Sequence, residues 1–201
     1  MIRFLIKIAL LILDNMLHVN FSKIMNGGIN MIVNSVNELC NLINKNRKDK
    51  KVVLATGTFD LFHYEHLIYL KGAKQSGDIL IVAVKSNKCA SLKDPNRPVI
   101  TEKHRIAIVD AIKYVDYSII VDYDPNVKLE VEPDNKKQEE WLIIFQELFE
   151  KLKPDILYYE ENPVLQSARD KVFELYGITG VSKERGKSES TTEIISKINK
   201  A

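Results

Sequence analysis

Two histidines, His63 and His66, follow a short apolar run and a glycine turn. The run, residues 52–55, is Val-Val-Leu-Ala, and Thr-Gly-Thr follows at 56–58, which predicts a buried strand that ends in a turn. The histidines begin an amphipathic segment, and one helical turn places both imidazoles on the same face. Because a helix N-terminus has free backbone N–H groups, imidazoles beside it suit an anion such as phosphate.

The same residue types do not favour a metal ion held by the protein. His63 and His66 lack the i, i+4 spacing of a helical zinc pair, and no cysteine or third histidine is placed to complete a site. Cys40 and Cys89 are isolated and form no CxxC pattern, as expected in a reducing compartment. We therefore predict no protein-held metal and a cytoplasmic location.

The apolar runs predict the elements that position these groups. Residues 79–84 form a continuous apolar run, typical of a parallel strand covered on both faces, and with the preceding strand and helix they form a right-handed βαβ unit. The alternation continues and predicts an α/β, Rossmann-like doubly wound parallel sheet with helices on both faces, which binds ligands at the carboxyl ends of its strands. Strands are predicted at 52–55, 79–84, 115–121, 156–159 and 178–181, and helices at 35–46, 67–76, 101–112, 141–152, 166–176 and 191–199.

One region departs from this alternation. Residues 122–137 are rich in Asp, Glu and Pro, and Val127, Leu129 and Val131 alternate with charged residues, which predicts a short edge strand or flap. The helical stripe that begins at Trp141 is predicted to pack into the core.

Length and charge limit the class of protein. A chain of 201 residues supports one domain with a full core. Its net charge of +2 gives no reason to expect nucleic acid or an anionic membrane as a partner. The apolar segment 4–13 is too short for a bilayer, which needs about 20 residues. We interpret 1–30 as an uncertain extension, either an amphipathic appendage or an over-extended gene start before Met31, with a membrane tether as the alternative.

Several motifs in one order resemble a known family. Residues 57–60, Gly-Thr-Phe-Asp, followed by His63 and His66, resemble the signature of the cytidylyltransferase-like nucleotidyltransferases, in which glycine stands at the position of Glu65. The segment 92–99 is similar to one in the sugar-phosphate branch, which includes the ADP-heptose synthases. Further similar segments are 102–105, 113–116, Arg185 and the closing 190–194, Ser-Thr-Thr-Glu-Ile.

The resemblance implies a reaction in which an acceptor phosphate oxygen attacks the α-phosphorus of ATP or CTP and pyrophosphate leaves. A phosphomonoester is largely dianionic at pH 7, since its second pKa is about 6, so the nucleophile needs no general base. The site must align the reactants and neutralise charge, for which hydrogen-bond donors and cations are suited. We predict His63, His66 and Lys93 as catalytic. The predicted nucleotide-binding residues are Thr56, Gly57, Thr58, Phe59, Arg105, Arg185, Ser190, Thr191 and Thr192.

The resemblance also implies Mg²⁺ on the triphosphate, held mostly by phosphate oxygens and water, and a homodimer. Asp60 is expected to brace the strand–helix turn. We assign 31–50 to a leading helix and loop, and 51–201 to a nucleotidyltransferase domain with a divergent insertion at 122–150. The resemblance implies one pocket that holds the phosphates between the two histidines and the closing helix. For such a pocket, His63 and His66 must lie near residues 190–192.

Three functions remain open. The first is transfer of AMP or CMP to a sugar or polyol phosphate, as in the ADP-heptose synthases. The second is a glycerol-3-phosphate-type cytidylyltransferase, which the ending 185–192 resembles. The third is a non-catalytic nucleotide-binding domain, because Glu65 replaces a glycine and because 159–162 is Tyr-Glu-Glu-Asn where many relatives have a glycine-rich turn.

Overall fold

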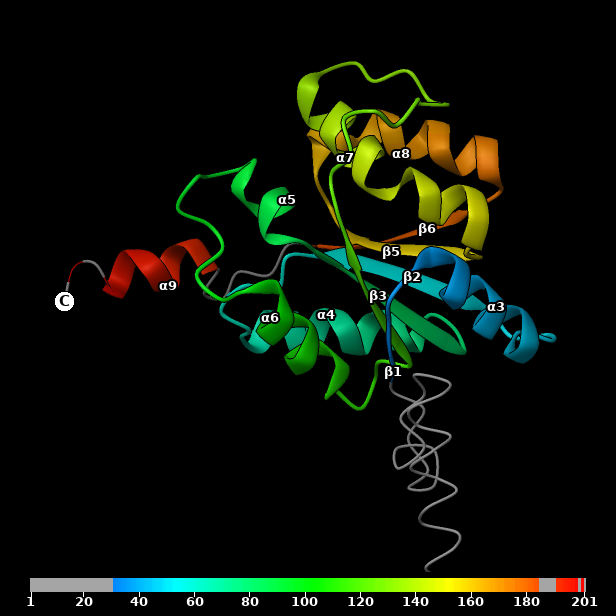
Figure 1. The fold of residues 1–201 in the computed structure, drawn as a ribbon, viewed down its shortest axis with the longest axis horizontal. Coiled ribbons are helices and arrows are strands. Elements are labelled where there is room, and N and C mark those ends of the chain that lie inside the picture. Colours follow the sequence, from blue (N-terminus) through cyan, green and yellow to red (C-terminus); the bar gives the residue numbers. More distant parts are fainter. Residues whose placement is uncertain (1–30, 185–190, 199, 201) are drawn as a thin grey trace, which may run out of the picture.

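A six-stranded parallel sheet forms the centre of the molecule in the computed structural model, which describes residues 31–184, 191–198 and 200 (Figure 1). The strand order is β1-β4-β3-β2-β5-β6, and every neighbouring pair is parallel. The predicted doubly wound α/β class is therefore confirmed. The strands are β1 (Met31–Val33), β2 (Val52–Gly57), β3 (Ile79–Lys85), β4 (Tyr117–Val121), β5 (Ile156–Glu160) and β6 (Thr179–Lys183).

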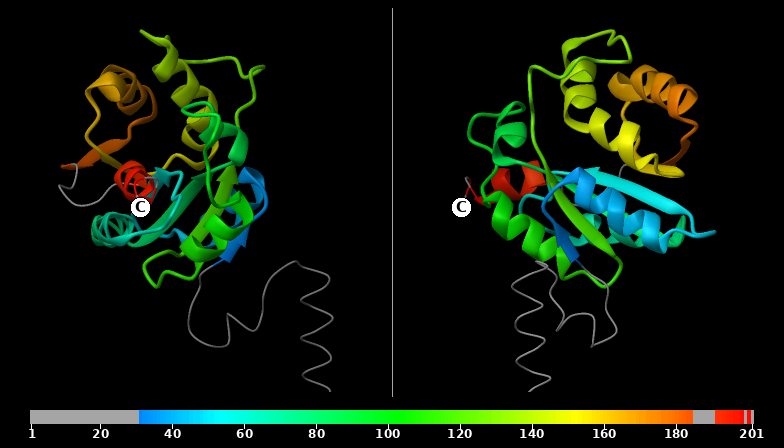
Figure 2. Two further views of the ribbon diagram at one scale, coloured as in Figure 1. Left: turned by 90° about the vertical axis from the view of Figure 1, so that its left-hand side faces the viewer. Right: turned by 45° about the vertical axis from the view of Figure 1, so that its right-hand side comes forward.

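Helices cover both faces of this sheet. Two helices, α4 and α6, pack on one face, whereas α3, α7 and α8 cover the other (Figures 1 and 2). The apolar residues form one core on each face, because side chains of a strand alternate between the two sides. The described helices are α3 (Val36–Asn46), α4 (Tyr64–Gln75), α5 (Asn87–Ser91), α6 (Glu102–Asp110), α7 (Lys136–Glu147), the π-helix η1 (Leu148–Leu152), α8 (Pro163–Tyr176) and α9 (Thr191–Ile198).

The strand order reverses between β2 and β5. From β2 the chain winds outward through β3 to β4, and it then crosses back to place β5 and β6 on the other side. Such a reversal opens a crevice at the carboxyl ends of the two central strands, where α/β proteins bind ligands. The Tyr69 hydroxyl of α4 spans this point, since it donates to the Tyr158 carbonyl at 2.7 Å and accepts from the Thr56 N–H at 3.3 Å.

Local sequence signals explain several helix ends. The Ser35 side chain accepts a hydrogen bond from the Glu38 N–H, as predicted for the start of α3. Asn162 caps α8, with Pro163 at the first helical position. Gly177 ends α8 with φ of 67°, a left-handed conformation that glycine adopts at little cost.

The structure differs from the sequence predictions in three elements. β1 was not predicted; it pairs with β4, and α3 buries Leu39 and Ile43, so residues 31–50 belong to the same sheet and core. The predicted edge strand at 127–131 is wrong: no strand forms there, and Val131 instead packs against the core. The segment between β3 and α6, for which no element was predicted, contains the short helix α5. The core position of the stripe beginning at Trp141 is confirmed.

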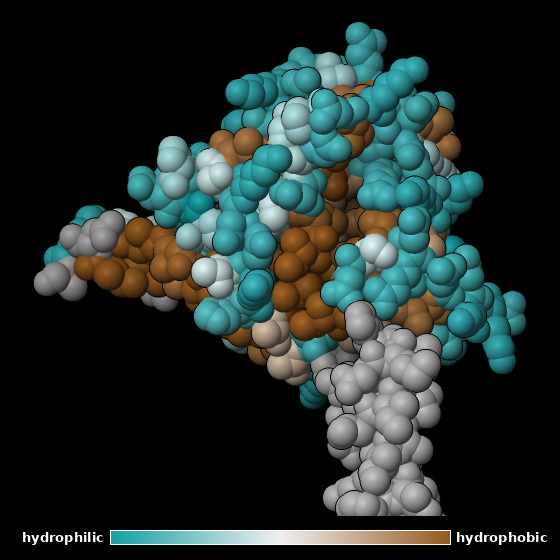
Figure 3. Space-filling view, in the orientation of Figure 1, coloured by the Kyte–Doolittle hydropathy of each residue, from teal (hydrophilic) through white to brown (hydrophobic). Residues whose placement is uncertain are grey.

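Helix α9 differs from the other helices in its exposure. None of its residues is buried, and Ile198 is 64% exposed. Figure 3 shows apolar side chains on the outside of this helix, at the left of the view. Among the described residues, no helix is both long and apolar enough to cross a membrane.

Candidate nucleotide-binding site

The turn after β2 has an unusual backbone. Phe59 and Leu61 adopt positive φ angles of 54° and 45°, which non-glycine residues rarely do. The Phe59 ring is buried and folds back over Gly57, so a Cβ added at Gly57 would lie 2.8 Å from that ring. Gly57 is therefore needed for the close approach of Phe59, and the turn directs the chain into α4.

The two histidines lie together at the start of α4. Their ring centroids are 4.0 Å apart, and the His63 N–H donates to Nδ1 of His66 at 3.3 Å. Because Nδ1 of His66 accepts a hydrogen bond, the proton of the neutral ring lies on Nε2. Burial, and then the neighbouring His63, lowers the pKa of His66 to about 4. His66 is thus a neutral donor whose Nε2–H is available to a ligand.

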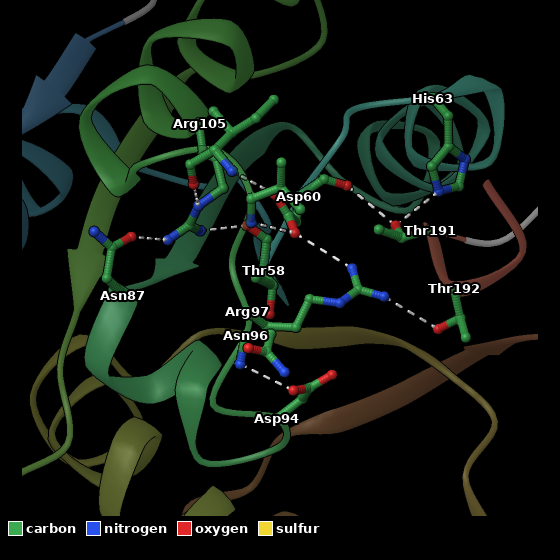
Figure 4. A network of polar contacts seen from close by, with 12 residues as sticks. Thr58, Asp60, His63, Asn87, Asp94, Asn96, Arg97, Arg105, Thr191 and Thr192 are labelled. Atoms are coloured by element: carbon green, nitrogen blue, oxygen red, sulfur yellow. Dashed lines mark hydrogen bonds and ion pairs between the residues drawn. The ribbon is translucent and has the colours of Figure 1, made fainter. Parts of the chain in front are cut away.

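Asp60 braces the segment that crosses over this turn, as predicted. Its buried carboxylate accepts from the N–H groups of Val99 and Ile100 at 3.0 and 2.9 Å. It also pairs with Arg97, at 3.3 Å, and Arg97 in turn lies 3.4 Å from the Thr192 hydroxyl (Figure 4). One buried carboxylate therefore holds the 97–100 segment against the turn after β2.

Helix α9 begins next to His63. The Thr191 hydroxyl donates to the Asp60 carbonyl at 3.1 Å and lies 3.3 Å from Nε2 of His63 (Figure 4). The required proximity of His63 to the start of the last helix is thus met at Thr191 and Thr192. The predicted residues Arg185 and Ser190 lie outside the described part of the chain.

Arg105 does not lie where a residue that binds the nucleotide is expected. Its side chain is fully buried, and its guanidinium donates to the carbonyls of Ile100 and Thr58 and to Oδ1 of Asn87 (Figure 4). It also does not line the pocket that opens at the carboxyl ends of β2, β3 and β5. A fixed set of protein acceptors therefore occupies this guanidinium, and Arg105 joins the turn after β2, the 97–100 segment and the start of α5.

A pocket of about 730 Å³ opens at the carboxyl ends of β2, β3 and β5. Most of the predicted site residues line it: Thr56, Gly57, Thr58, Phe59, His63, His66, Lys93, Thr191 and Thr192. Further residues line the pocket that were not predicted from the sequence, among them Lys85, Arg97, Trp141, Phe145, Tyr159 and Arg169. Lys85 could have been predicted from the sequence, because a lysine at the end of an apolar run marks the carboxyl end of a strand.

Glu65 faces the same pocket but has a cationic partner. Its carboxylate lies 2.7 Å from the Lys183 ammonium of β6, and both side chains are 17% exposed. Part of the negative charge that replaces the family glycine is therefore balanced within the protein. Glu160, Glu161 and Asn162, which stand in place of the glycine-rich turn, also line the pocket.

No cluster of three or more His, Cys, Asp or Glu side chains suited to a metal ion is present in the described part of the chain. Within the pocket, the Asp60 carboxylate is occupied by Arg97 and two backbone N–H groups. The donor set is instead rich in hydroxyl, imidazole and ammonium groups, which bind phosphate oxygens. These residues fit a magnesium ion that is carried by a triphosphate better than one held by carboxylates.

A doubly wound parallel sheet, with two helix N-termini and a pocket rich in hydrogen-bond donors at its topological switch point, defines a nucleotide-binding α/β domain. The family model described as cytidylyltransferase-like matches residues 54–197, and the chain belongs to this family.

Curated relatives match part of the chain. It is 39% identical to the bifunctional protein HldE of Campylobacter jejuni subsp. doylei over 98 residues, which are 48% of this chain and 21% of the relative. It is 42% identical to an FAD synthase of Archaeoglobus fulgidus over 83 residues, 40% of this chain and 59% of the relative. The matched segments thus span 21% and 59% of these relatives, less than two thirds of either. A pantoate-beta-alanine ligase structure from Francisella tularensis has the same fold, with a TM-score of 0.63 and 17% identity over 85% of this chain and 78% of that one.

Proposed function

We propose that this protein transfers AMP or CMP from a nucleoside triphosphate to a sugar or polyol phosphate and releases pyrophosphate. The observation that supports this most is the contact between Thr191, at the start of α9, and His63, at the start of α4. Two helix N-termini then face one pocket, and each favours the negative charge of a phosphate chain.

In the proposed reaction, an acceptor phosphate oxygen forms a bond to the α-phosphorus while the bond from that phosphorus to the β-bridging oxygen breaks. The Nε2–H of His66 and the side chains of His63 and Lys93 donate to the oxygens on which charge develops. The Thr192 hydroxyl and the backbone N–H groups at the start of α9 hold the departing pyrophosphate. A donor placed in this way contributes about 2–4 kcal/mol to transition-state stabilisation. Mg²⁺ bound to the triphosphate supplies further charge neutralisation.

The acceptor is proposed from the resemblance of 92–99 to the sugar-phosphate branch and from the HldE match. A second candidate acceptor is FMN, because one relative is an FAD synthase and because the half-buried Tyr159 gives the pocket an aromatic side chain against which a flavin ring can pack. Glycerol 3-phosphate with CTP is a third, and a non-catalytic nucleotide-binding domain is the alternative of another class.

Pyrophosphate release tests these candidates. The full chain is incubated with Mg²⁺ and with ATP or CTP, against sugar 1-phosphates, glycerol 3-phosphate and FMN, and then without Mg²⁺. We expect release with one class of acceptor, a loss of at least 100-fold in kcat for His63→Ala or His66→Ala, and little change for the exposed Glu174→Gln. Nucleotide binding without turnover on any acceptor would favour the non-catalytic domain.

The cytoplasmic location and the homodimer are parts of this proposal. The first is supported by the isolated cysteines, Cys40 and Cys89, which are both free thiols. Cell fractionation and light scattering of the purified chain measure the two properties. A stable monomer at micromolar concentration would remove the dimer from the proposal.

A further inference from the structure

Arg169 is a buried cation on the wall of the pocket. It lies on α8, is 5% exposed, and lines the pocket together with Tyr159, whose ring centroid is 4.1 Å from its guanidinium. Its Nε and Nη1 atoms are buried and have no hydrogen-bond partner among the described residues. The contrast with Arg105 is direct, since that equally buried guanidinium donates to three protein acceptors.

Such an arrangement is costly unless something else supplies the acceptors. A guanidinium stays charged in proteins, and leaving its donors unpaired in a buried place costs more than an ordinary lost hydrogen bond. Stacking on an aromatic ring recovers about 0.5–2 kcal/mol but does not satisfy the in-plane N–H groups. The unpaired donors therefore indicate an oxyanion ligand, which accepts from the fork-shaped guanidinium in two parallel hydrogen bonds.

A second cation lines the same pocket. Lys85 ends β3, lines the pocket, and has its ammonium 5.6 Å from the Phe145 ring centroid. Burial lowers the pKa of this lysine. Like Arg169, it forms no hydrogen bond or ion pair with a described residue within the usual distances. Two cations that make no hydrogen bond to a described residue, Arg169 and Lys85, thus line one pocket.

The position of the triphosphate decides which anion these cations would bind. Under the proposed function, the phosphates lie at the N-termini of α4 and α9, beside His63 and Thr191. The nucleoside itself carries no formal charge. We propose, on the basis of that function, that Arg169, assisted by Lys85, binds the phosphoryl group of the acceptor and so restricts the enzyme to phosphorylated acceptors.

The first test uses inorganic phosphate as the probe. The Arg169 Nε–H resonance is assigned by its absence from the spectrum of Arg169→Met, and phosphate is titrated with and without a saturating non-hydrolysable ATP analogue. We expect this resonance to shift with phosphate in both titrations and Arg169→Met to lose at least tenfold in affinity for phosphate. A control, Lys137→Met, removes an exposed cation of α7 outside the pocket and should bind phosphate like the wild type.

Three outcomes separate the roles of Arg169. If it binds the acceptor, Arg169→Met raises the KM for the phosphorylated acceptor at least tenfold, leaves the affinity for the ATP analogue within about twofold, and does not lower Tm, because an apolar side chain replaces an unpaired buried charge. A fall in Tm of several degrees with unchanged phosphate binding would mean a structural role and would overturn the proposal. Weaker binding of the ATP analogue with unchanged phosphate binding would assign Arg169 to the nucleotide and would also overturn it.

If the proposed transferase function is wrong, the experiments give a different result than if the anion site is wrong. A wild-type protein that binds no nucleotide contradicts the transferase, and the titration without the analogue still reports on Arg169. An unmoved Nε–H resonance in that titration would contradict the anion site itself.

Discussion

The ammonium of Lys183 lies 2.7 Å from a carboxylate oxygen of Glu65, at the entrance to the histidine end of the pocket. This pair joins β6 to the first turn of α4 and places one negative and one positive charge near the proposed phosphate site. The effect of Glu65 on ligand binding therefore depends on Lys183, and the two residues should be changed separately.

Neutralising Glu65 and neutralising Lys183 should change the triphosphate affinity in opposite directions. Glu65→Gln leaves Lys183 as a net positive charge and should tighten ATP binding about threefold, and Lys183→Met should weaken it by a similar factor, for a screened charge interaction of about 1 kcal/mol or less. Glu65→Gly should also tighten binding. Calorimetric titration at two salt concentrations measures the effect, which should shrink at high salt. Weaker binding in both Glu65→Gln and Lys183→Met would show that the pair acts by positioning α4.

The lowered pKa of His66 predicts a pH dependence of stability. In the folded chain this imidazole has a pKa of about 4, against 6.5 when unperturbed, so between these values the unfolded state binds more protons. Its contribution to stability is complete above pH 6.5 and is lost as the pH falls towards 4, up to about 3 kcal/mol. Urea unfolding across this range measures the slope, which should decrease in His66→Gln. An equal slope in both proteins would contradict the assignment.

Arg105 should affect folding more than nucleotide binding. Arg105→Lys retains the charge but cannot reach the acceptors on Thr58, Ile100 and Asn87 together, so we expect a loss of about 2–4 kcal/mol in the free energy of unfolding. Chemical denaturation measures this, with the exposed Lys103→Arg of the same helix as the control. Unchanged stability with abolished ATP binding would instead restore the role predicted from the sequence.

Gly72 and Tyr158 should show non-additive effects. A Cβ at Gly72 would overlap the Tyr158 hydroxyl, so Gly72→Ala should lose about 1–3 kcal/mol from overpacking. Tyr158→Phe removes the hydroxyl, and the double variant should be more stable than the sum of the single changes predicts. Thermal unfolding of the four proteins forms the cycle. Strict additivity would mean that α4 shifts as a whole to make room.

The success of the sequence predictions follows from how local each signal is. Strand β3 and helix α3 were recognised because a continuous apolar run and a capping serine carry their own evidence. Strand β1 has three residues, too few for a periodic pattern, and is defined by pairing with β4. The alternation at 127–131 suggested a strand, but a strand needs a partner, and Val131 packs into the core from a loop instead.

For the candidate site too, the residues with a local sequence signal were predicted and those without one were not. His63 and His66 belong to one contiguous motif and Thr191 to a second, and the family resemblance implied that the two motifs meet, as the contact between His63 and Thr191 shows. Arg105 and Arg169 are both arginines on helices, and nothing local distinguishes them. Only the packed structure shows that the first has protein acceptors and the second faces the pocket without them.

The hydroxyl of Tyr69 has a consequence for motion. It links α4, which carries the two histidines, to the backbone of β2 and β5 on either side of the crevice. Breathing of the two strands at this edge must either break those bonds or carry the helix along. The imidazoles are therefore tied to the carboxyl ends of β2 and β5, so a ligand that changes the separation of these two strands would also move the two histidines.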